Sequence, residues 1–248
     1  MTPLPETPLT DLELEQWRRD GYVTPVWAMP PEEMTRRRTR FQREFDGAPS
    51  MNRHCDLPAI AEICRKVDLW GRLATLLGPD MVLWRTNLFL GNPALQWHED
   101  QHARLLGGGF GVSALLAMTD GSSENCTLLA PGSHRMSPEQ KEQRYGIGAQ
   151  RQAGGNIRYT GAVAETDFIR MPLQAGQCLI FHPELLHASS GIVAGDTAPP
   201  ERMNLVLRVT GVVPIAAAAY APTLPLVTRP ILIRGVDRQG LNEYGSLP

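Results

Sequence analysis

The chain has 248 residues, of which 42% are hydrophobic and 20% are charged, and its formal net charge is −2. This composition is typical of a globular protein with a full apolar core, and it excludes a protein that binds nucleic acid through an overall basic charge. The sequence contains no run of about 18 apolar residues and begins with an acidic stretch rather than a secretory signal, so we expect a cytoplasmic protein without a membrane partner.

The first predicted elements are a short helix and a strand. Thr10 and Glu13 have the spacing of a capping box, which opens a helix that Gly21 can end. Residues 22–27 then have the pattern of a strand.

A second helix is expected to begin at the Pro30-Pro31 pair, with acidic residues in its first turn. Met34, Phe41 and Phe45 share one face of this helix. Five arginines cover much of the rest: Arg36, Arg37, Arg38, Arg40 and Arg43. We interpret them as a solvated helix face, and a basic patch for an anionic partner is the alternative.

Residues 57–78 predict one or two further helices. Their apolar stripe consists of Leu69, Leu73, Leu76 and Leu77, and Gly78 stands where a helix commonly ends. This stripe indicates packing against a core.

After Pro79 the chain changes to short apolar runs that glycine, proline or polar clusters separate. The runs cover residues 81–90, 112–118, 127–130, 178–181 and 204–210. Many short strands of this kind are typical of a β-sandwich or barrel. We therefore predict a mainly β fold with flanking helices, organised as one domain over residues 1–248. Helical support covers about 1–80, the β core about 81–213 and a C-terminal extension about 214–248.

The four cysteines are Cys55, Cys64, Cys126 and Cys178, and no two of them form a CxxC pair. This spacing argues against a zinc knuckle and favours reduced, mostly buried thiols. A secreted protein with two disulfides is the alternative.

The clearest chemical motif is the His98-Glu99-Asp100 sequence. Residues two apart on a strand face the same side, so His98 and Asp100 can share one metal ion. An imidazole and a carboxylate are two of the three ligands in the 2-His-1-carboxylate iron site, which leaves positions open for an oxidant and a bidentate cosubstrate. The HxD pair is a weak signal when it stands alone.

A third ligand and a cosubstrate anchor must come from later in the chain. The segment 176–187 offers His182 at the end of a predicted strand and His187 after a short turn. The strand around 201–208 carries Arg202 and Arg208. A planar guanidinium pairs bidentately with a carboxylate, so an arginine here can hold the distal carboxylate of 2-oxoglutarate.

Four stretches of the sequence carry a family resemblance. They are residues 84–89 running into 97–100, residues 125–135 (Asn-Cys-Thr-Leu-Leu-Ala-Pro-Gly-Ser-His-Arg), residues 186–189 and residues 202–204. From about Leu83 to Val209 the chain thereby resembles the phytanoyl-CoA dioxygenase family of iron(II)- and 2-oxoglutarate-dependent enzymes. The Asp20-Gly21-Tyr22 sequence also fits the usual opening of that family.

The resemblance implies a double-stranded β-helix, or jelly roll, with helices packed outside. It implies that iron(II) binds to His98, Asp100 and His187, with His187 rather than His182 as the distal ligand. Ser189 and Arg202 match positions that bind the cosubstrate 2-oxoglutarate, and O2 is the oxidant.

The implied activity is hydroxylation, or another oxidation, of an unactivated C–H bond. Halogenases on this scaffold replace the HxD carboxylate with a small residue, so Asp100 favours hydroxylation over chlorination. We expect a small polar substrate such as an amino acid or a natural-product intermediate, and no nucleic-acid or membrane partner.

Two positions depart from the pattern of the family. Many relatives have a lysine shortly before HxD, where this chain has Gly91-Asn92, and a glutamine between the two ligands, where it has Glu99. Both positions are expected near cosubstrate or substrate. They leave open which group besides Arg202 anchors 2-oxoglutarate.

Other histidines receive more ordinary interpretations. His102 extends the HxD spacing, and we read it as a polar strand residue, with a pocket-lining or ligand role as alternatives. His182 is expected in the core, His134 in a structural turn and His54 at the surface.

Several loops and charged residues are expected near the substrate pocket because loops carry specificity on rigid scaffolds. They are Gly107-Gly108-Gly109 and the stretch from about Tyr145 to Arg170. Arg85 and Glu124 could meet a polar substrate or form ordinary surface pairs.

Two rival functions remain from the sequence. One is a jelly-roll binding protein without turnover, which the complete set of ligands and arginine disfavours. The other is a cupin-type metal enzyme that does not use 2-oxoglutarate. Such sites usually contain more histidines, whereas this chain has HxD.

Overall fold

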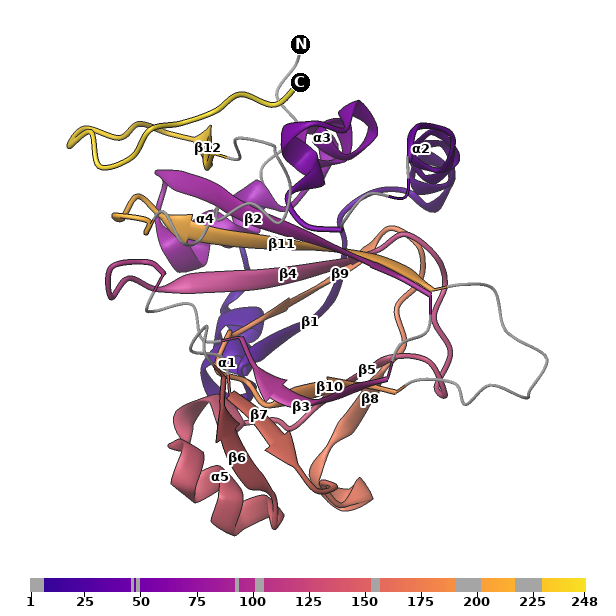
Figure 1. Cartoon of the computed structure of the whole chain (residues 1–248), viewed down its shortest axis with the longest axis vertical. Coiled ribbons are helices and arrows are strands. Elements are labelled where there is room, and N and C mark those ends of the chain that lie inside the picture. Colours follow the sequence, from indigo (N-terminus) through magenta and orange to yellow (C-terminus); the bar gives the residue numbers. More distant parts are fainter. Residues whose placement is uncertain are drawn as a thin grey trace.

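The structure, a computed structural model, describes residues 7–45, 47, 50–91, 94–100, 105–152, 157–190, 202–216 and 229–248. Its centre consists of two antiparallel sheets that face each other (Figure 1). Over these residues the major sheet contains, in spatial order, β1 (Tyr22–Trp27), β9 (Gln177–Phe181), β4 (Gly111–Ala117), β11 (Met203–Gly211), β2 (Met81–Leu90) and β12 (Ile231–Arg234). The minor sheet contains β6 (Gly148–Arg151), β7 (Ile157–Thr160), β3 (Leu95–Glu99), β10 (His187–Ser189), β5 (Thr127–Leu129) and β8 (Ile169–Met171).

Helices and short 3₁₀ turns lie outside these sheets. They are α1 (Asp11–Asp20), α2 (Pro31–Glu44), η1 (Arg53–Cys55), α3 (Pro58–Lys66), α4 (Trp70–Leu77), η2 (Ser133–Arg135), α5 (Pro138–Tyr145) and η3 (Glu165–Asp167). In Figure 1, α2 and α3 lie beyond the major sheet, and α5 lies beyond the minor sheet. The predicted jelly roll with helices packed outside is confirmed. No helix in the described part of the chain combines the length and the apolarity that crossing a membrane requires.

The predicted start of the chain is confirmed. The Thr10 hydroxyl accepts a hydrogen bond from the Glu13 amide at 3.3 Å, and Glu13 accepts one from the Thr10 amide at 2.7 Å. Gly21 ends α1 in the left-handed conformation with φ of 82°. The strand β1 follows at once and pairs with β9.

The largest apolar cluster lies between the helices and the outer face of the major sheet. Met34 and Phe41 of α2 are buried there, as are Leu69 and Leu73 of the predicted leucine stripe. Facing them is every second residue of the strands, for example Leu205, Leu207 and Ile180. Because alternate residues of a strand point to opposite faces, their neighbours are left to face the other sheet.

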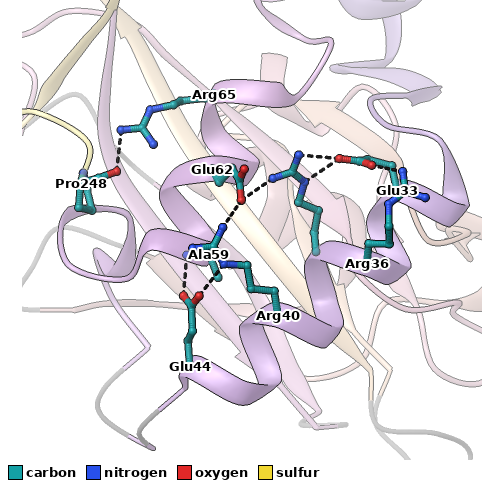
Figure 2. A network of polar contacts seen from close by, with 9 residues as sticks. Glu33, Arg36, Arg40, Glu44, Ala59, Glu62, Arg65 and Pro248 are labelled. Atoms are coloured by element: carbon teal, nitrogen blue, oxygen red, sulfur yellow. Dashed lines mark hydrogen bonds and ion pairs between the residues drawn. The ribbon is translucent and has the colours of Figure 1, made fainter.

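Three arginines of α2, namely Arg36, Arg37 and Arg40, form ion pairs within the molecule (Figure 2). Arg36 and Arg37 pair with Glu33, Arg37 and Arg40 with Glu62 of α3, and Arg40 with Glu44. Glu44 also accepts a hydrogen bond from the Ala59 amide at 2.9 Å, which joins α2 to the start of α3. These pairs favour the expected solvated helix face over a basic patch, since local acids offset the positive charge.

The expectation for His54 is wrong. Its side chain is 1% exposed, and its Nδ1 lies 2.9 Å from Thr86 Oγ1. The 3₁₀ turn η1 places His54 against Thr86 of β2, and the local sequence does not predict this tertiary contact. The four cysteines are free, and three of them are buried, as predicted.

Candidate metal centre

Two neighbouring strands of the minor sheet carry the predicted ligands. In the pairing of β3 with β10, His98 lies opposite His187, and their ring centroids are 4.1 Å apart. Asp100 follows β3 directly, and its amide donates to the Pro183 carbonyl at 2.8 Å. The period of two along β3 turns His98 and Asp100 to the same side, toward the major sheet.

The three side chains converge closely enough to hold one ion. One ligand atom from each of His98, Asp100 and His187 lies within 4.8 Å of the other two. Two imidazoles and one carboxylate form the donor set of the 2-His-1-carboxylate iron sites. These residues form a candidate metal centre.

Both histidines are held in the same tautomer. The Nδ1 of His98 lies 2.8 Å from the Gln96 carbonyl, and the Nδ1 of His187 lies 2.8 Å from the Leu185 carbonyl. A carbonyl oxygen only accepts, so each Nδ1 must carry the hydrogen, and each Nε2 keeps its lone pair for a metal. Such a contact on the second ring nitrogen orients a ligating histidine and raises its basicity.

His187 is kept neutral by its surroundings. Burial, and then the neighbouring His98, lower the pKa of His187 to about 3. A neutral imidazole is the form that binds metals, so the free site needs no deprotonation of this residue at neutral pH.

Asp100 is held from the opposite sheet. It is 6% exposed, and its Oδ1 and Oδ2 accept from Arg208 Nη2 at 2.9 Å and Nη1 at 2.5 Å. The Ser113 hydroxyl donates to Oδ2 at 2.9 Å. Arg208 also donates from Nε to Asn87 Oδ1 at 3.2 Å. Arg208 therefore faces inward, where it contacts the carboxylate of the candidate centre.

Arg202 and Ser189 meet beside the same centre. The Nη2 of Arg202 donates a hydrogen bond to the Ser189 hydroxyl. With the amide orientation that satisfies both of its polar atoms, Asn204 Oδ1 accepts from Arg202 Nε at 3.2 Å. Arg202 is 6% exposed, and burial lowers the pKa of its guanidinium. A buried, oriented guanidinium is suited to a carboxylate ligand.

One cavity connects these groups. It has about 440 Å³ of open space, which includes its opening to solvent. Its described lining is Phe89, Leu95, His98, Asp100, Leu115, Thr127, Phe181, His187, Ala188, Ser189, Arg202, Asn204, Val206 and Arg208. The five residues named from the sequence, namely His98, Asp100, His187, Arg202 and Ser189, all lie on it.

His182, the other candidate for the distal histidine, lies elsewhere. Its ring packs against Trp17, Phe110 and His134 with centroid distances of 5.8, 5.1 and 5.2 Å. Burial lowers its pKa to about 4. His182 is only partly buried, so the predicted core position is wrong: it lies in an aromatic cluster at the edge of the core. The contact with His182 gives His134 the structural place that was expected for it.

Glu99 does not lie near the cavity, so that expectation is wrong. The alternation of β3 turns it to the outer face of the minor sheet, where its carboxylate is 2.8 Å from Lys141 Nζ and accepts from the Tyr159 hydroxyl. The other departure includes Asn92, which lies outside the described residues, and so does His102.

The loops expected at the pocket are not part of its described lining. The backbone at Gly107 and Gly109 packs against Pro214 and Val213 instead. The described part of the stretch 145–170 forms the outer strands β6, β7 and β8. Glu124 is exposed and Arg85 lies opposite Arg208 in the pairing of β2 with β11.

Sequence reasoning missed several residues of the site. Ser113, Asn87 and Asn204 contact the charged groups, but none of the three was given a role in the site from the sequence. A lone hydroxyl in the apolar run Gly111–Ala117 was a usable signal, because a buried polar group requires a partner.

Comparisons with known proteins agree with this geometry. The family model for "Phytanoyl-CoA dioxygenase (PhyH)" matches residues 17–197. Among curated protein sequences, no significant match to the chain was found.

Solved structures share the fold at low sequence identity. A non-heme monooxygenase, ThoJ, in complex with nickel is 23% identical, with a TM-score of 0.70 over 96% of this chain and 89% of its own. CytC3 with Fe(II) and alpha-ketoglutarate is 22% identical, with a TM-score of 0.68 over 96% and 93%. The alpha-ketoglutarate-dependent carbocyclase SnoK from nogalamycin biosynthesis is 15% identical, with a TM-score of 0.65 over 85% and 87%.

Proposed function

The chain belongs to the phytanoyl-CoA dioxygenase family, and from this premise we propose that it is an iron(II)- and 2-oxoglutarate-dependent oxygenase. Its proposed reaction is the hydroxylation, or a related oxidation, of an unactivated C–H bond in a small polar metabolite such as an amino acid or a natural-product intermediate. His98, Asp100 and His187 are the proposed iron ligands, and Arg202 and Ser189 the proposed anchors of 2-oxoglutarate.

The observation that carries this proposal is the convergence of His98, Asp100 and His187 on one point. The donor set fits iron(II), because imidazole and carboxylate ligands suit that ion and three ligands leave room for others. Both histidines present Nε2 by virtue of their Nδ1 contacts, and Asp100 keeps lone pairs beyond those that Arg208 and Ser113 use.

When bound, iron(II) and 2-oxoglutarate would activate O2, which supplies the oxidising power: two of its four oxidising equivalents convert 2-oxoglutarate to succinate and CO2, and the other two oxidise the substrate. The side chains of this chain would bind and orient the cosubstrate and the substrate, and they would exclude water. Arg202, with Ser189 and Asn204 fixing its plane, receives the distal carboxylate of the keto acid at one end of the cavity. The apolar residues Phe89, Leu115 and Phe181 line the rest and keep the site dry.

The lining of the cavity supports a small substrate. The enclosed space must also hold 2-oxoglutarate, which limits the size of the substrate beside it. Polar groups at Asn87, Thr127 and Arg208 lie near the centre, which suits a substrate with hydrogen-bonding groups.

Asp100 supports hydroxylation as the outcome because it supplies the third protein ligand, which halogenases on this scaffold lack. SnoK, a carbocyclase, shares this fold, so the fold by itself is compatible with other oxidative outcomes. We therefore propose hydroxylation first and ring closure or desaturation as variants of the same oxidation.

The test is an anaerobic titration of the purified protein with iron(II) and 2-oxoglutarate, followed by visible absorption. A weak charge-transfer band should appear only when both are present. In Arg202→Ala the band should require about 100-fold more 2-oxoglutarate, because truncating one partner of a buried charge pair costs about 2–5 kcal/mol.

Oxygen consumption then separates the rival functions. Uptake that depends on 2-oxoglutarate and yields succinate is expected for the proposed oxygenase. Iron binding without any response to 2-oxoglutarate would indicate a cupin-type enzyme, and no uptake under any condition would indicate a binding protein; either result contradicts the proposal.

A further inference from the structure

A buried lysine reaches from α5 to the strand β3 and to the turn before β10, the two segments from which the candidate ligands come. Lys141 is 1% exposed, although it belongs to an otherwise polar helix. Its ammonium is 2.8 Å from Glu99 Oε1 and donates to the Glu184 carbonyl at 2.9 Å. An ammonium without charged or polar partners is very costly to bury, so these contacts define where α5 and the two segments sit.

The first contact is on the strand that supplies two ligands. Glu99 stands between His98 and Asp100 and points to the opposite face of β3. It is 1% exposed, and it also accepts a hydrogen bond from the Tyr159 hydroxyl on β7. A residue fixed in this way fixes the strand, and the side chains before and after it must then project from the other face at set positions.

The second contact is on the turn that supplies the third ligand. Glu184 lies in the turn between β9 and β10. Its carbonyl, which accepts from Lys141, belongs to the peptide group that joins it to Leu185. The Leu185 carbonyl accepts a hydrogen bond from His187 Nδ1, and the Pro183 carbonyl accepts one from the Asp100 amide. The ammonium of Lys141 therefore holds the turn from which both His187 and Asp100 are oriented.

We propose that Lys141 is a positioning residue of the metal centre, acting through Glu99 on β3 and through the Glu184 carbonyl before β10. It sets the separation of the His98–Asp100 pair from His187 without touching the metal. The inference rests on the proposed function, since it presupposes an ion at this centre. A pair kept only for stability would be replaceable by neutral side chains of similar size at little cost.

Cobalt(II) binding to the metal-free protein, followed by visible absorption, gives a readout apart from activity. Lys141→Met should bind Co(II) about 10- to 100-fold more weakly, as is usual when outer contacts of ligands are lost. It should also unfold at lower denaturant concentration, because it leaves the Glu99 carboxylate buried without the ammonium.

The double variant Glu99→Gln with Lys141→Met separates positioning from stability. It contains neither charge, so its unfolding midpoint should return toward that of the wild-type protein. If Lys141 positions the centre, Co(II) affinity should stay about tenfold or more below that of the wild-type protein, with a shifted d–d band. Wild-type affinity and an unchanged band in this variant would overturn the inference.

Two further variants control for folding. Arg53→Met removes a buried cation that pairs with Asp56 away from the centre, and it should lower the unfolding midpoint without changing Co(II) affinity. Lys141→Arg retains the charge with a different reach, and it should fold and still shift the band; an unchanged band would contradict the inference.

The wild-type measurement distinguishes the two levels of the argument. If the wild-type protein does not bind Co(II), the proposed function fails, and the inference fails with it. If the wild-type protein binds Co(II) and Lys141→Met binds it equally well with the same spectrum, only the inference fails.

Discussion

At the scale of single residues, Asp100 serves two sets of partners. Arg208 and Ser113 of the major sheet donate hydrogen bonds to its carboxylate, and the proposed iron requires one lone pair of the same carboxylate. A carboxylate has about four lone-pair sites, so both are compatible. The guanidinium and the hydroxyl then keep the carboxylate in one orientation, and the guanidinium offsets its charge before a metal binds.

Replacing Asp100 with alanine should abolish metal-dependent oxidation and weaken iron(II) binding by at least about 100-fold, because a charged ligand is lost. Activity and calorimetric metal binding, with circular dichroism to confirm folding, provide the measurement. Ser113→Ala is the matched control, since it removes one hydrogen bond to the same carboxylate; a reduction of about tenfold at most is expected. Full activity in Asp100→Ala would contradict the ligand assignment.

At the scale of elements, two helices end in the same way but meet different neighbours. Gly21 ends α1 and Gly146 ends α5, with φ of 82° and 65°. A Cβ at Gly21 would lie 2.4 Å from His134 Nδ1, whereas no atom lies within 4 Å of a Cβ at Gly146. The end of α1 is therefore packed against η2, and the end of α5 is open.

Alanine at these two glycines should separate backbone strain from crowding. Gly146→Ala should lower the free energy of unfolding by about 1–2 kcal/mol, the cost of a left-handed residue with a Cβ. Gly21→Ala should lose a further ~1–3 kcal/mol because His134 must move. Equal losses in chemical denaturation would show that His134 yields freely.

At the scale of the whole molecule, the fold buries histidines in neutral form in several places. Burial lowers the pKa of His54 to about 3 from an ordinary 6.5, and it also lowers those of His182 and His187. The unfolded chain then binds more protons than the folded one below pH 6.5. The part of the stability that depends on these neutral histidines is therefore fully present above that pH and is lost as the pH falls toward 3.

His54 gives a test of this pH dependence away from the metal centre. Between pH 7 and pH 5, a histidine with these two pKa values lowers the free energy of unfolding by about 2 kcal/mol. His54→Asn should therefore lose about 2 kcal/mol less than the wild-type protein over that interval, measured by urea unfolding at each pH. An identical pH dependence of the two proteins would refute the effect of burial at this residue.

Much of the fold follows from local pattern. The five apolar runs became strands with ends within one residue of those predicted, since a strand with one buried face needs little more than its own alternation. The strands β6, β7, β8, β10 and β12 were not predicted. They are short, and their pairing with neighbours holds them rather than their own composition. The helix α5 was also missed, although Ser137 and Gln140 have the capping-box spacing.

The sequence by itself determined which residues the proposed chemistry uses: the HxD spacing, the later histidine and the arginine are local facts, and the family resemblance ordered them. Only the tertiary structure decided which residues surround that chemistry. It paired Arg208 with Asp100 and Glu99 with Lys141, each as an ion pair, and it buried His54. The physical reason is that a side chain's direction follows from its own strand, whereas its partners come from strands and helices far away in the chain.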